Sequence, residues 1–459
     1  MSPQTAFFLC IAFIALLFLI DIRQKAQVSH AIWLPTIWMM YCGSRPLAYW
    51  FEPVSLGGLQ VDSGEGSAID RTFLSILIGF GVFILVRRKL DWQRILKSNL
   101  WVFILFSYMV LSVLWSDLPA VSFKRWIRTT GDLVMVLLVL TEVDSLEAIK
   151  TIVRRSAFVL LPLSIILIKY FRDIGVAYTE DGSTTMWTGV TTHKNVLGYV
   201  VMVCALYFVK NIFTVKHPKK IIIDISFLVM MLWLIFGTSS SKSSTTSLSA
   251  LVLGLGVLMA AHWSGKDLEK FRRFIIITVL VLPLFAVIYA TFVGSPFDAA
   301  MGGMGRDTTL TGRTEIWSAA LDVGPGNPFI GRGYGSFWIG NTAEEVWRNL
   351  TYHTHFTQSH NGYIDIYLEL GALGVILLAC LIWSVCRNIG QTFANDVEYG
   401  TYRMAFLSAV VMHNLTESSY GRPTHLLWFM FLLSCVHITA VPERETRPPL
   451  KVRPFLQPG

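Results

Sequence analysis

Apolar runs follow one another along almost the whole chain, and shorter polar segments separate them. A run long enough to fill the hydrocarbon layer of a bilayer, with few charged residues, predicts a helix that crosses a membrane. A helix also satisfies its own backbone hydrogen bonds, as lipid requires. The sequence therefore predicts an all-α polytopic membrane protein with about 12–13 transmembrane helices. They are expected near residues 5–20, 30–43, 72–86, 100–115, 129–141, 156–170, 196–209, 221–237, 247–262, 274–293, 363–386, 404–418 and 425–441.

The composition agrees with this pattern and narrows the class of protein. Hydrophobic residues make up 53% of the chain and charged residues only 15%, whereas a soluble domain carries about 25% charged residues. In a membrane protein a net charge of +8 reflects basic loops and contact with anionic lipids, so we expect no nucleic-acid partner. The cysteines have neither zinc nor disulfide spacing and lie in or beside apolar runs, at Cys10, Cys42, Cys204, Cys380, Cys386 and Cys435.

Lysine and arginine are unevenly divided between the two sets of connecting loops. One set and the C-terminal tail hold 24 of the 38, and loops rich in these residues face the cytoplasm. The C-terminus is therefore expected inside and the N-terminus outside. The first apolar run has no basic leader or obvious cleavage site, so we expect it to be a retained span.

This orientation gives the chain a coarse organisation around one very long outer segment. That segment contains Gly, Pro, Trp and Arg, which favours a folded loop over a flexible linker. The expected parts are N-terminal transmembrane helices (1–100), a transmembrane core with short outer motif loops (100–293), the large outer loop (294–362), C-terminal transmembrane helices (363–441) and a basic cytoplasmic tail (442–459).

Basic residues recur where two of the outer segments meet a span. In "WSDLPAVSFKRWIRT", Lys124, Arg125 and Arg128 share one face if the segment is helical. They could bind phosphate or merely contact lipid headgroups. In "TTHKNVLGY", three different hydrogen-bonding groups stand at the mouth of a span, which exceeds what membrane anchoring needs. They are His193, Lys194 and Asn195.

Two further outer segments combine cations with hydroxyl groups or an aromatic ring. "GTSSSKSSTTS" surrounds Lys242 with serines, a combination that suits sugar or phosphate oxygens or simply makes a polar turn. "TLTGRTEIWSAA" places Arg313 and Trp317 at i and i+4 of an expected helix that Thr311 or Thr314 caps. The following "FIGRGYGSF" lacks the end of a phosphate-binding P-loop and is better explained as a tight turn, so Arg332 is a weaker candidate.

The stretch "FTQSHNGYIDIYLELGALG" places ionisable groups where the chain enters a span. Such groups normally face the protein interior and mark functional sites. His360 stands at the mouth, whereas Asp365 and Glu369 lie one to two turns inside. Glu369 could instead accept hydrogen bonds from loop amides. The spacing of His353, His355 and His360 matches no zinc pattern well, so no metal is expected.

These motifs together resemble the O-antigen ligase and polysaccharide polymerase superfamily. "SHNGYIDIYLELGALG" is similar to that family's His-Asn pair followed by a Glu and two glycines, and "TGRTEIW" to its Gly-Arg and downstream Trp. "THKNVLG", "SSSKSSTTSL" and "HNLTESSY" resemble its exopolysaccharide polymerase branch. The resemblance covers roughly residues 100 to 440 in motif order.

The resemblance implies a membrane glycosyltransferase with its site on the periplasmic side of the bacterial inner membrane. The donor would be an undecaprenyl-diphosphate-linked glycan and the acceptor another glycan or a lipid-linked one, in an inverting transfer without metal, nucleotide or other cofactor. Arg313 would match the essential arginine and His360 the essential histidine. The expected substrate-binding residues are His193, Lys194, Asn195, Arg125, Arg128, Lys242, Asn361, Glu369 and Trp317.

The chemistry of such a transfer fits these residues. Negative charge builds on the diphosphate leaving group, so fixed cations should stabilise it. A histidine can take the proton of the acceptor hydroxyl, or only position that hydroxyl.

Three alternatives stay open. Polymerisation is favoured over ligation to the lipid A core by "THKN" and "LTESS". A transporter or flippase of lipid-linked glycans would need polar groups near the bilayer midplane, where segments such as "IIITVLVLPLFAVIYATF" are almost wholly apolar. A non-catalytic scaffold in a polysaccharide assembly complex would not need the particular Arg and His.

Overall fold

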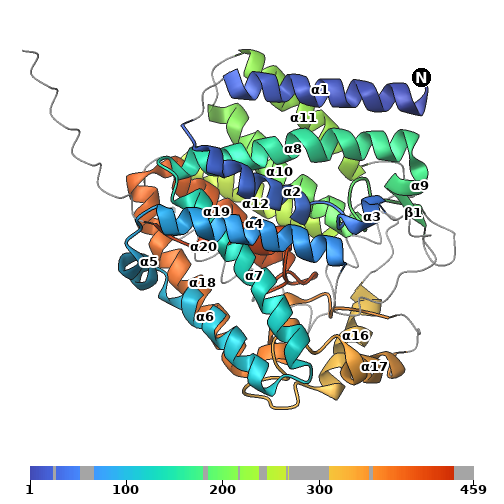
Figure 1. The fold of residues 1–459 in the computed structure, drawn as a ribbon, viewed down its shortest axis with the longest axis vertical. Coiled ribbons are helices and arrows are strands. Elements are labelled where there is room, and N and C mark those ends of the chain that lie inside the picture. The colour runs from blue at the N-terminus through green and yellow to red at the C-terminus, as the bar shows by residue number, and fades with distance from the viewer. Residues whose placement is uncertain are drawn as a thin grey trace, which may run out of the picture.

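In the part of the chain that the structure describes, the protein is a bundle of helices with one small β-hairpin (Figure 1). This computed structural model describes residues 1–23, 27–51, 67–178, 185–214, 218–236, 245–264, 267, 310–350 and 355–438. The helices that match expected spans are α1 (Pro3–Arg23), α2 (Trp33–Cys42), α4 (Ala68–Arg87), α6 (Leu100–Leu111), α7 (Pro119–Leu140), α8 (Ser145–Tyr170), α10 (Lys194–Thr214), α11 (Pro218–Phe236), α12 (Thr245–Ser264), α18 (Gly362–Asn395), α19 (Val397–His413) and α20 (Leu426–Cys435).

Shorter elements connect these helices. They are η1 (His30–Ile32), α3 (Ala48–Phe51), α5 (Trp92–Ser98), η2 (Ser112–Trp115), α9 (Arg172–Gly175), α16 (Leu310–Val323) and α17 (Gly340–Arg348). The hairpin strands β1 (Val176–Tyr178) and β2 (Thr185–Trp187) pair antiparallel, with Val176 opposite Trp187. The expected span at 274–293 lies outside the described residues.

Among the described residues, five helices are long and apolar enough to cross a membrane. They are α1, α4, α8, α10 and α18, and a sixth is present if α5 and the α6–η2 segment, which meet at 88°, form one broken span. The all-α polytopic architecture is therefore confirmed, while the other expected spans within the described residues are shorter or less apolar than a simple crossing requires.

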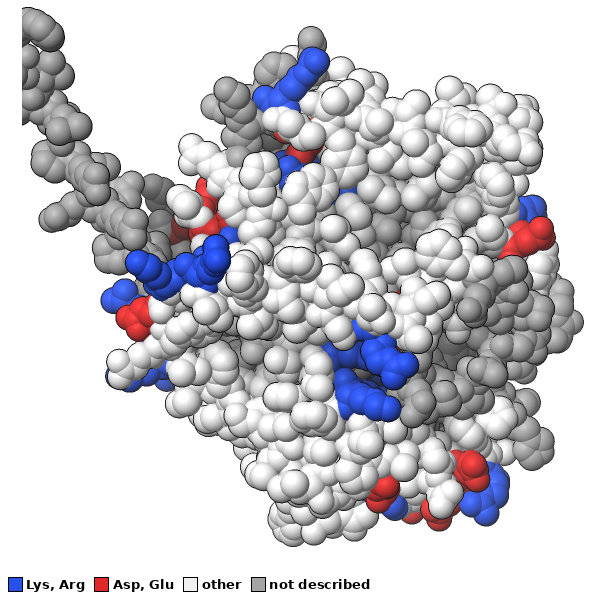
Figure 2. Space-filling model, in the orientation of Figure 1, with Lys and Arg blue, Asp and Glu red and all other residues white. Residues whose placement is uncertain are grey.

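The burial of the helices indicates which of them face lipid. In α10 every residue from Leu197 to Phe208 is buried, so this helix is apolar on all sides and lies in the middle of the bundle. In contrast, α1 and α4 keep wide apolar faces exposed, including Phe8, Leu19 and Phe83, and Figure 2 shows few charged side chains over these two helices. We infer that these outer faces contact the hydrocarbon region.

A break in α18 receives part of the preceding loop. Gly371 has φ +66° and ψ −168°, which ends one helical segment and starts another. Backbone amides of Arg332 and Gly333 donate to the carbonyls of Leu368 and Glu369, and Ala372 N–H donates to Pro328 O. The loop thus satisfies backbone groups that the break leaves free, as must happen where lipid replaces water. The "GRGYG" stretch therefore forms a backbone insert, which agrees with its interpretation as a structural turn.

Replacing Gly371 by alanine should destabilise this junction. A Cβ at Gly371 would lie 2.3 Å from the carbonyl carbon of Phe329, and its positive φ is itself unfavourable for other residues. We expect a loss of about 1–3 kcal/mol or more in the free energy of unfolding, measured by thermal unfolding in detergent. Gly390→Ala in the same helix is the control, because no atom lies within 4 Å of its Cβ position. Equal melting temperatures for the two variants would contradict the assigned role of the break.

The described part of the large loop is folded and rests on α18. Helices α16 and α17 lie together at the lower right of Figure 1. Ile316, Phe337, Trp338 and Val346 form a small hydrophobic cluster there that includes Leu368 of α18. This second core packs α16 against the bundle and so sets the position of the helix that carries Arg313 and Trp317.

Candidate functional site

The carboxylate of Glu417 is the centre of a polar cluster at one end of the bundle. Its Oε1 lies 2.7 Å from Arg313 Nη2 and accepts a 2.7 Å hydrogen bond from Asn195 Nδ2. Its Oε2 lies 2.9 Å from His360 Nδ1. One carboxylate thereby joins α10, α16, the residue that precedes the α18 cap, and the loop after α19.

The loop that carries Glu417 is buried and held by side chains rather than by regular structure. Asn414 organises it, because its Oδ1 accepts from the amides of Ser419 and Tyr420 while its Nδ2 donates to Ser419 Oγ. A Cβ at Gly362 would lie 2.1 Å from Asn414 Oδ1, so only glycine allows α18 to start this close to the loop.

A buried carboxylate in α7 fixes the far end of the same loop. Asp132 accepts from Trp38 Nε1 at 2.7 Å and from the Thr424 amide at 3.2 Å. Its side chain is fully buried within the bundle. Ionisable groups are expensive there and persist where partners satisfy them, so Asp132 is a structural support for the loop between α19 and α20.

His360 is held in a left-handed backbone conformation at the entrance to α18. Its φ is +56°, which is uncommon for residues other than glycine. The next residue, Asn361, caps α18, because its Oδ1 accepts from the amides of Tyr363 and Ile364. On the other side, Asp365 Oδ1 accepts from the Ser359 amide. These bonds hold an unfavourable conformation in place, a feature that clusters at functional sites.

The contact with Glu417 fixes which ring nitrogen of His360 carries the proton. An ionised carboxylate only accepts hydrogen bonds, so Nδ1 must donate. In the neutral ring Nε2 then has the free lone pair and can act as a base. A carboxylate that orients a histidine in this way is the arrangement used in hydrolase triads.

Arg313 and Trp317 reach the cluster from the same face of α16, as their i, i+4 spacing predicts. Trp317 Nε1 donates to Ser359 O at 2.8 Å, next to His360. The guanidinium of Arg313 is mostly buried, and burial lowers its pKa while the charge of Glu417 opposes that shift. Thr311 and Thr314 lie inside α16, which begins at Leu310, so neither is the cap residue that the sequence suggested.

The start of α10 supplies the remaining polar groups. His193 Nδ1 accepts from the Asn195 amide at 3.2 Å and so caps the first turn. Lys194 interacts electrostatically with both Glu417 and Arg313, and His193 with Glu417 and His360. The "HKN" motif therefore lies beside the arginine and the histidine that come much later in the sequence.

The charge of Glu417 persists well into acid. Burial alone would raise its pKa, but the hydrogen bond from His360 and the positive charges of His360, Arg313 and His413 outweigh it and bring the pKa to about 2. Because this value is below the usual one of 4.5, Glu417 stabilises the fold above pH 4.5, and this contribution disappears as the pH falls through 2.

This linkage gives a pH-dependent difference between the protein and a Glu417→Gln variant. The advantage in melting temperature of the unmodified protein should be constant near neutrality and shrink below about pH 4.5. Thermal unfolding in detergent from pH 7 to pH 3 measures it. An advantage that grows on acidification would contradict the low pKa of Glu417.

Several expected site residues have their described contacts elsewhere. Arg125 Nη1 donates to Gly335 O at 2.8 Å. Arg128 interacts electrostatically with Tyr41 of α2. Both lie within α7, which confirms that their segment is helical. Lys242 and His353 lie outside the described residues.

Both polar groups of the Asn361 side chain have partners within the protein. Its Oδ1 caps α18, and its Nδ2 donates to Leu415 O.

Glu369 accepts a hydrogen bond from the loop insert, which agrees with the alternative in which this carboxylate binds loop amides. Its Oε2 accepts from the Gly335 amide at 2.9 Å. We expect Glu369→Gln to keep near-normal activity, because glutamine retains an acceptor oxygen. Glu369→Ala should lower the free energy of unfolding by about 1–3 kcal/mol, because it leaves a buried amide unpaired. A large loss of transfer in a stably folded Glu369→Gln variant would instead indicate a role in substrate binding.

Glu417 was not identified as a candidate from the sequence. It fell inside the expected span at 404–418, whereas α19 ends at His413. The signal available was the polar string "HNLTESSY", which is too rich in hydrogen-bonding groups for the end of a membrane helix. Asp132 was missed for a similar reason, because it is a single carboxylate inside an expected span.

Fold and site together define a multi-pass membrane protein with a polar, cation-bearing cluster at one end of its bundle. Residues 226–379 match a family model described as O-Antigen ligase. The chain is also 26% identical over 389 residues to the exopolysaccharide production protein ExoQ of Rhizobium meliloti (strain 1021), a match that covers 81% of this chain and 84% of that relative. Both similarities support the resemblance to the O-antigen ligase and polysaccharide polymerase superfamily that the sequence motifs indicate.

Proposed function

We propose that the protein transfers a glycan from an undecaprenyl-diphosphate donor to a sugar hydroxyl at the periplasmic face of the bacterial inner membrane. The observation that carries this proposal is the Glu417 carboxylate, which brings Arg313, Asn195 and His360 together. A fixed cation beside an oriented histidine is what a sugar–diphosphate transfer needs. The family match and the named relative, an exopolysaccharide production protein, support the same class of reaction.

In the proposed reaction, Arg313 acts on the leaving group. As the acceptor oxygen bonds to the anomeric carbon, the bond from that carbon to the diphosphate oxygen breaks, and both bonding electrons leave with the diphosphate. Arg313 can fork two hydrogen bonds to this group, and Lys194 adds a second charge nearby. Attack from the face opposite the leaving group inverts the anomeric configuration.

His360 acts on the acceptor. Its Nδ1 donates to Glu417, so Nε2 is available to accept the proton of the attacking hydroxyl. Glu417 holds the ring and stabilises the imidazolium that forms. The diphosphate would compete with Glu417 for Arg313, so donor binding should loosen the 2.7 Å Arg313–Glu417 pair.

Polymerisation is favoured over ligation, because the relative that covers most of the chain is named for exopolysaccharide production. Transfer to a lipid A core remains the second candidate within the superfamily. A transporter is less well supported, since the cluster gathers at one end of the bundle, although Asp132 shows that a polar group does lie within it.

An in vitro transfer reaction with the full-length protein tests the proposal. A defined lipid-diphosphate donor is offered with a second donor unit in one reaction and with a lipid A core acceptor in another. Elongated lipid-linked product in the first reaction identifies a polymerase, and transfer to the core identifies a ligase. Failure in both reactions, with the same preparation moving intact donor across proteoliposomes, would identify a transporter instead.

A further inference from the structure

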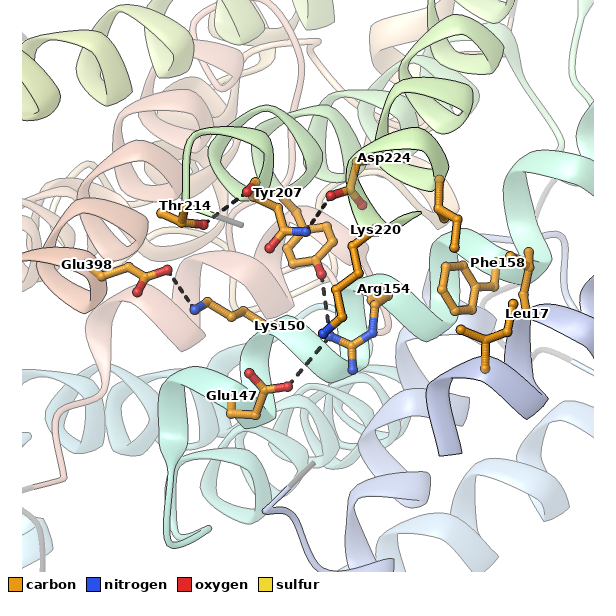
Figure 3. Close-up of a pocket in the computed structure, with 13 residues that line it drawn as sticks. Leu17, Glu147, Lys150, Arg154, Phe158, Tyr207, Thr214, Lys220, Asp224 and Glu398 are labelled. Atoms are coloured by element: carbon orange, nitrogen blue, oxygen red, sulfur yellow. Dashed lines mark hydrogen bonds and ion pairs between the residues drawn. The ribbon is translucent and has the colours of Figure 1, made fainter. Parts of the chain in front are cut away.

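A second polar site lies at the opposite end of the helix bundle. It is a cavity of about 280 Å³ formed by α1, α8, α10, α11 and α19 (Figure 3). The helices α10 and α19 have their other ends at the Glu417 cluster. Because Asn195 and Asn211 are sixteen positions apart on α10, about 24 Å of helix separates the two sites.

The lining of this cavity is divided between polar and apolar side chains. Figure 3 shows Lys150, Glu147 and Glu398 on one side, and Phe158 and Leu17 on the other. Leu17 belongs to α1, whose outer face is exposed and apolar. Ile20 of α1 and Ile223 of α11 also line the cavity and are only partly buried, so the apolar wall is partly exposed, as a site for a headgroup and the first part of its acyl chains would require.

The charges in the cavity are balanced rather than uniformly basic. Three cations face three carboxylates, and most of them already have partners. Lys150 pairs with Glu398 at 2.6 Å, and Asp224 accepts from Asn211 at 2.7 Å. The charged lining residues are Glu147, Lys150, Arg154, Lys220, Asp224 and Glu398. Such a lining gives no excess positive potential that would attract a purely anionic ligand.

Two charges of opposite sign remain available to a ligand. Within the described part of the chain, the exposed residue Lys220 has no hydrogen bond or close ion pair, and its charge acts on Asp224 only at longer range. Glu147 Oε1 accepts a long 3.5 Å hydrogen bond from Thr151 Oγ1 and lies 3.6 Å from Arg154 Nη1, but its side chain stays 30% exposed. Lys220 comes from α11 and Glu147 from α8, so the two line different walls of the same cavity.

We propose that this cavity binds the zwitterionic headgroup of an inner-leaflet phospholipid with a primary ammonium, such as phosphatidylethanolamine. Lys220 binds the phosphodiester, and Glu147 accepts hydrogen bonds from the ammonium. The apolar wall of Leu17, Phe158 and Ile223 contacts the start of an acyl chain. This binding is separate from glycan transfer and does not depend on the proposed reaction.

Native mass spectrometry of the full-length protein in detergent tests the proposal with three phospholipids of identical acyl chains. The headgroups are ethanolamine, choline, which has no N–H donor, and glycerol, which has no cation. We expect the ethanolamine lipid to bind tightest. Lys220→Ala and Glu147→Gln should each weaken its binding about tenfold, as the loss of one charge-assisted hydrogen bond predicts. Lys97→Ala, an exposed lysine of α5 outside the cavity, should leave binding unchanged.

Glu147→Gln separates a zwitterion site from a simple anion site. Removing this carboxylate should narrow the preference for ethanolamine over glycerol headgroups, because the repulsion of the anionic lipid is relieved. Equal or tighter binding of the glycerol lipid to the unmodified protein would overturn the proposal. Displacement of the bound lipid by millimolar inorganic phosphate would also overturn it, and would identify a site for phosphate alone. Unchanged ethanolamine-lipid binding in both variants would show that the lipid binds elsewhere.

Discussion

Arg313→Ala is expected to lower glycan transfer by about 10²–10³-fold while the protein remains inserted in the membrane. That range is typical for the loss of one donor that stabilises charge developing in a transition state. Arg313 is mostly buried and held at 2.7 Å from Glu417, so it is already positioned before substrate arrives. Arg313→Lys should recover only part of the rate, because an ammonium cannot fork two hydrogen bonds to a diphosphate.

The matched control for this prediction is Arg348→Ala in the same large loop. Arg348 lies in α17 and, among the described residues, donates only to the nearby Glu344 O. Its replacement should leave the transfer rate within about twofold of the unmodified protein, as for a surface change away from special features. Arg313→Ala also leaves Glu417 without its cation, so melting temperatures must accompany the rates. A well-folded Arg313→Ala variant with a normal rate would refute the role of this arginine.

Glu417→Gln is expected to lower the transfer rate by about 10²–10⁴-fold, the range spanned by oxyanion-hole and triad-carboxylate replacements. Glutamine has nearly the same shape, so the loop should keep its fold. It can present either its carbonyl oxygen or its amide NH2 group to His360, and the histidine is then no longer held in the tautomer with a free Nε2. Glu417 is a positioning residue in this proposal, since it contacts His360 rather than the substrate.

A double-mutant cycle distinguishes positioning from a general structural effect. If Glu417 acts largely through His360, Glu417→Gln should cost much less in a His360→Ala background than on its own, because residues that act as a unit are not additive. Fully additive losses would indicate independent roles. The exposed Glu344→Gln in α17 serves as the control and should be neutral in both backgrounds.

The sequence predicted the features that depend only on residues close to one another in the chain. Apolar length predicted the membrane helices, because lipid allows little besides a self-satisfied helix. Within the described residues each expected span coincides with a helix, with ends shifted by several residues. The sequence also predicted that Arg313 and Trp317 lie on the same face of a helix, because their spacing is i and i+4.

Other features needed contacts between distant segments. Glu417 lies 57 positions after His360, 104 after Arg313 and 222 after Asn195, and no spacing rule relates residues so far apart. The sequence left open whether Glu369 binds substrate or accepts hydrogen bonds from loop amides, and only the structure shows that its Oε2 accepts from the Gly335 amide. Hydrogen bonds between the loop and the break in α18 form only because the two backbones lie close together, and the sequence of neither segment shows this.

Hydropathy was enough to predict that this chain is an all-α membrane protein, and the positions of the basic, histidine and hydroxyl groups placed them at the ends of its spans. These properties follow from the hydropathy and periodicity of each segment and do not depend on the other segments. Which of those groups come into contact depends instead on how distant segments pack. The break at Gly371, the glycine at 362 and the buried loop after α19 allow close backbone approach, and that approach places one carboxylate between an arginine and a histidine.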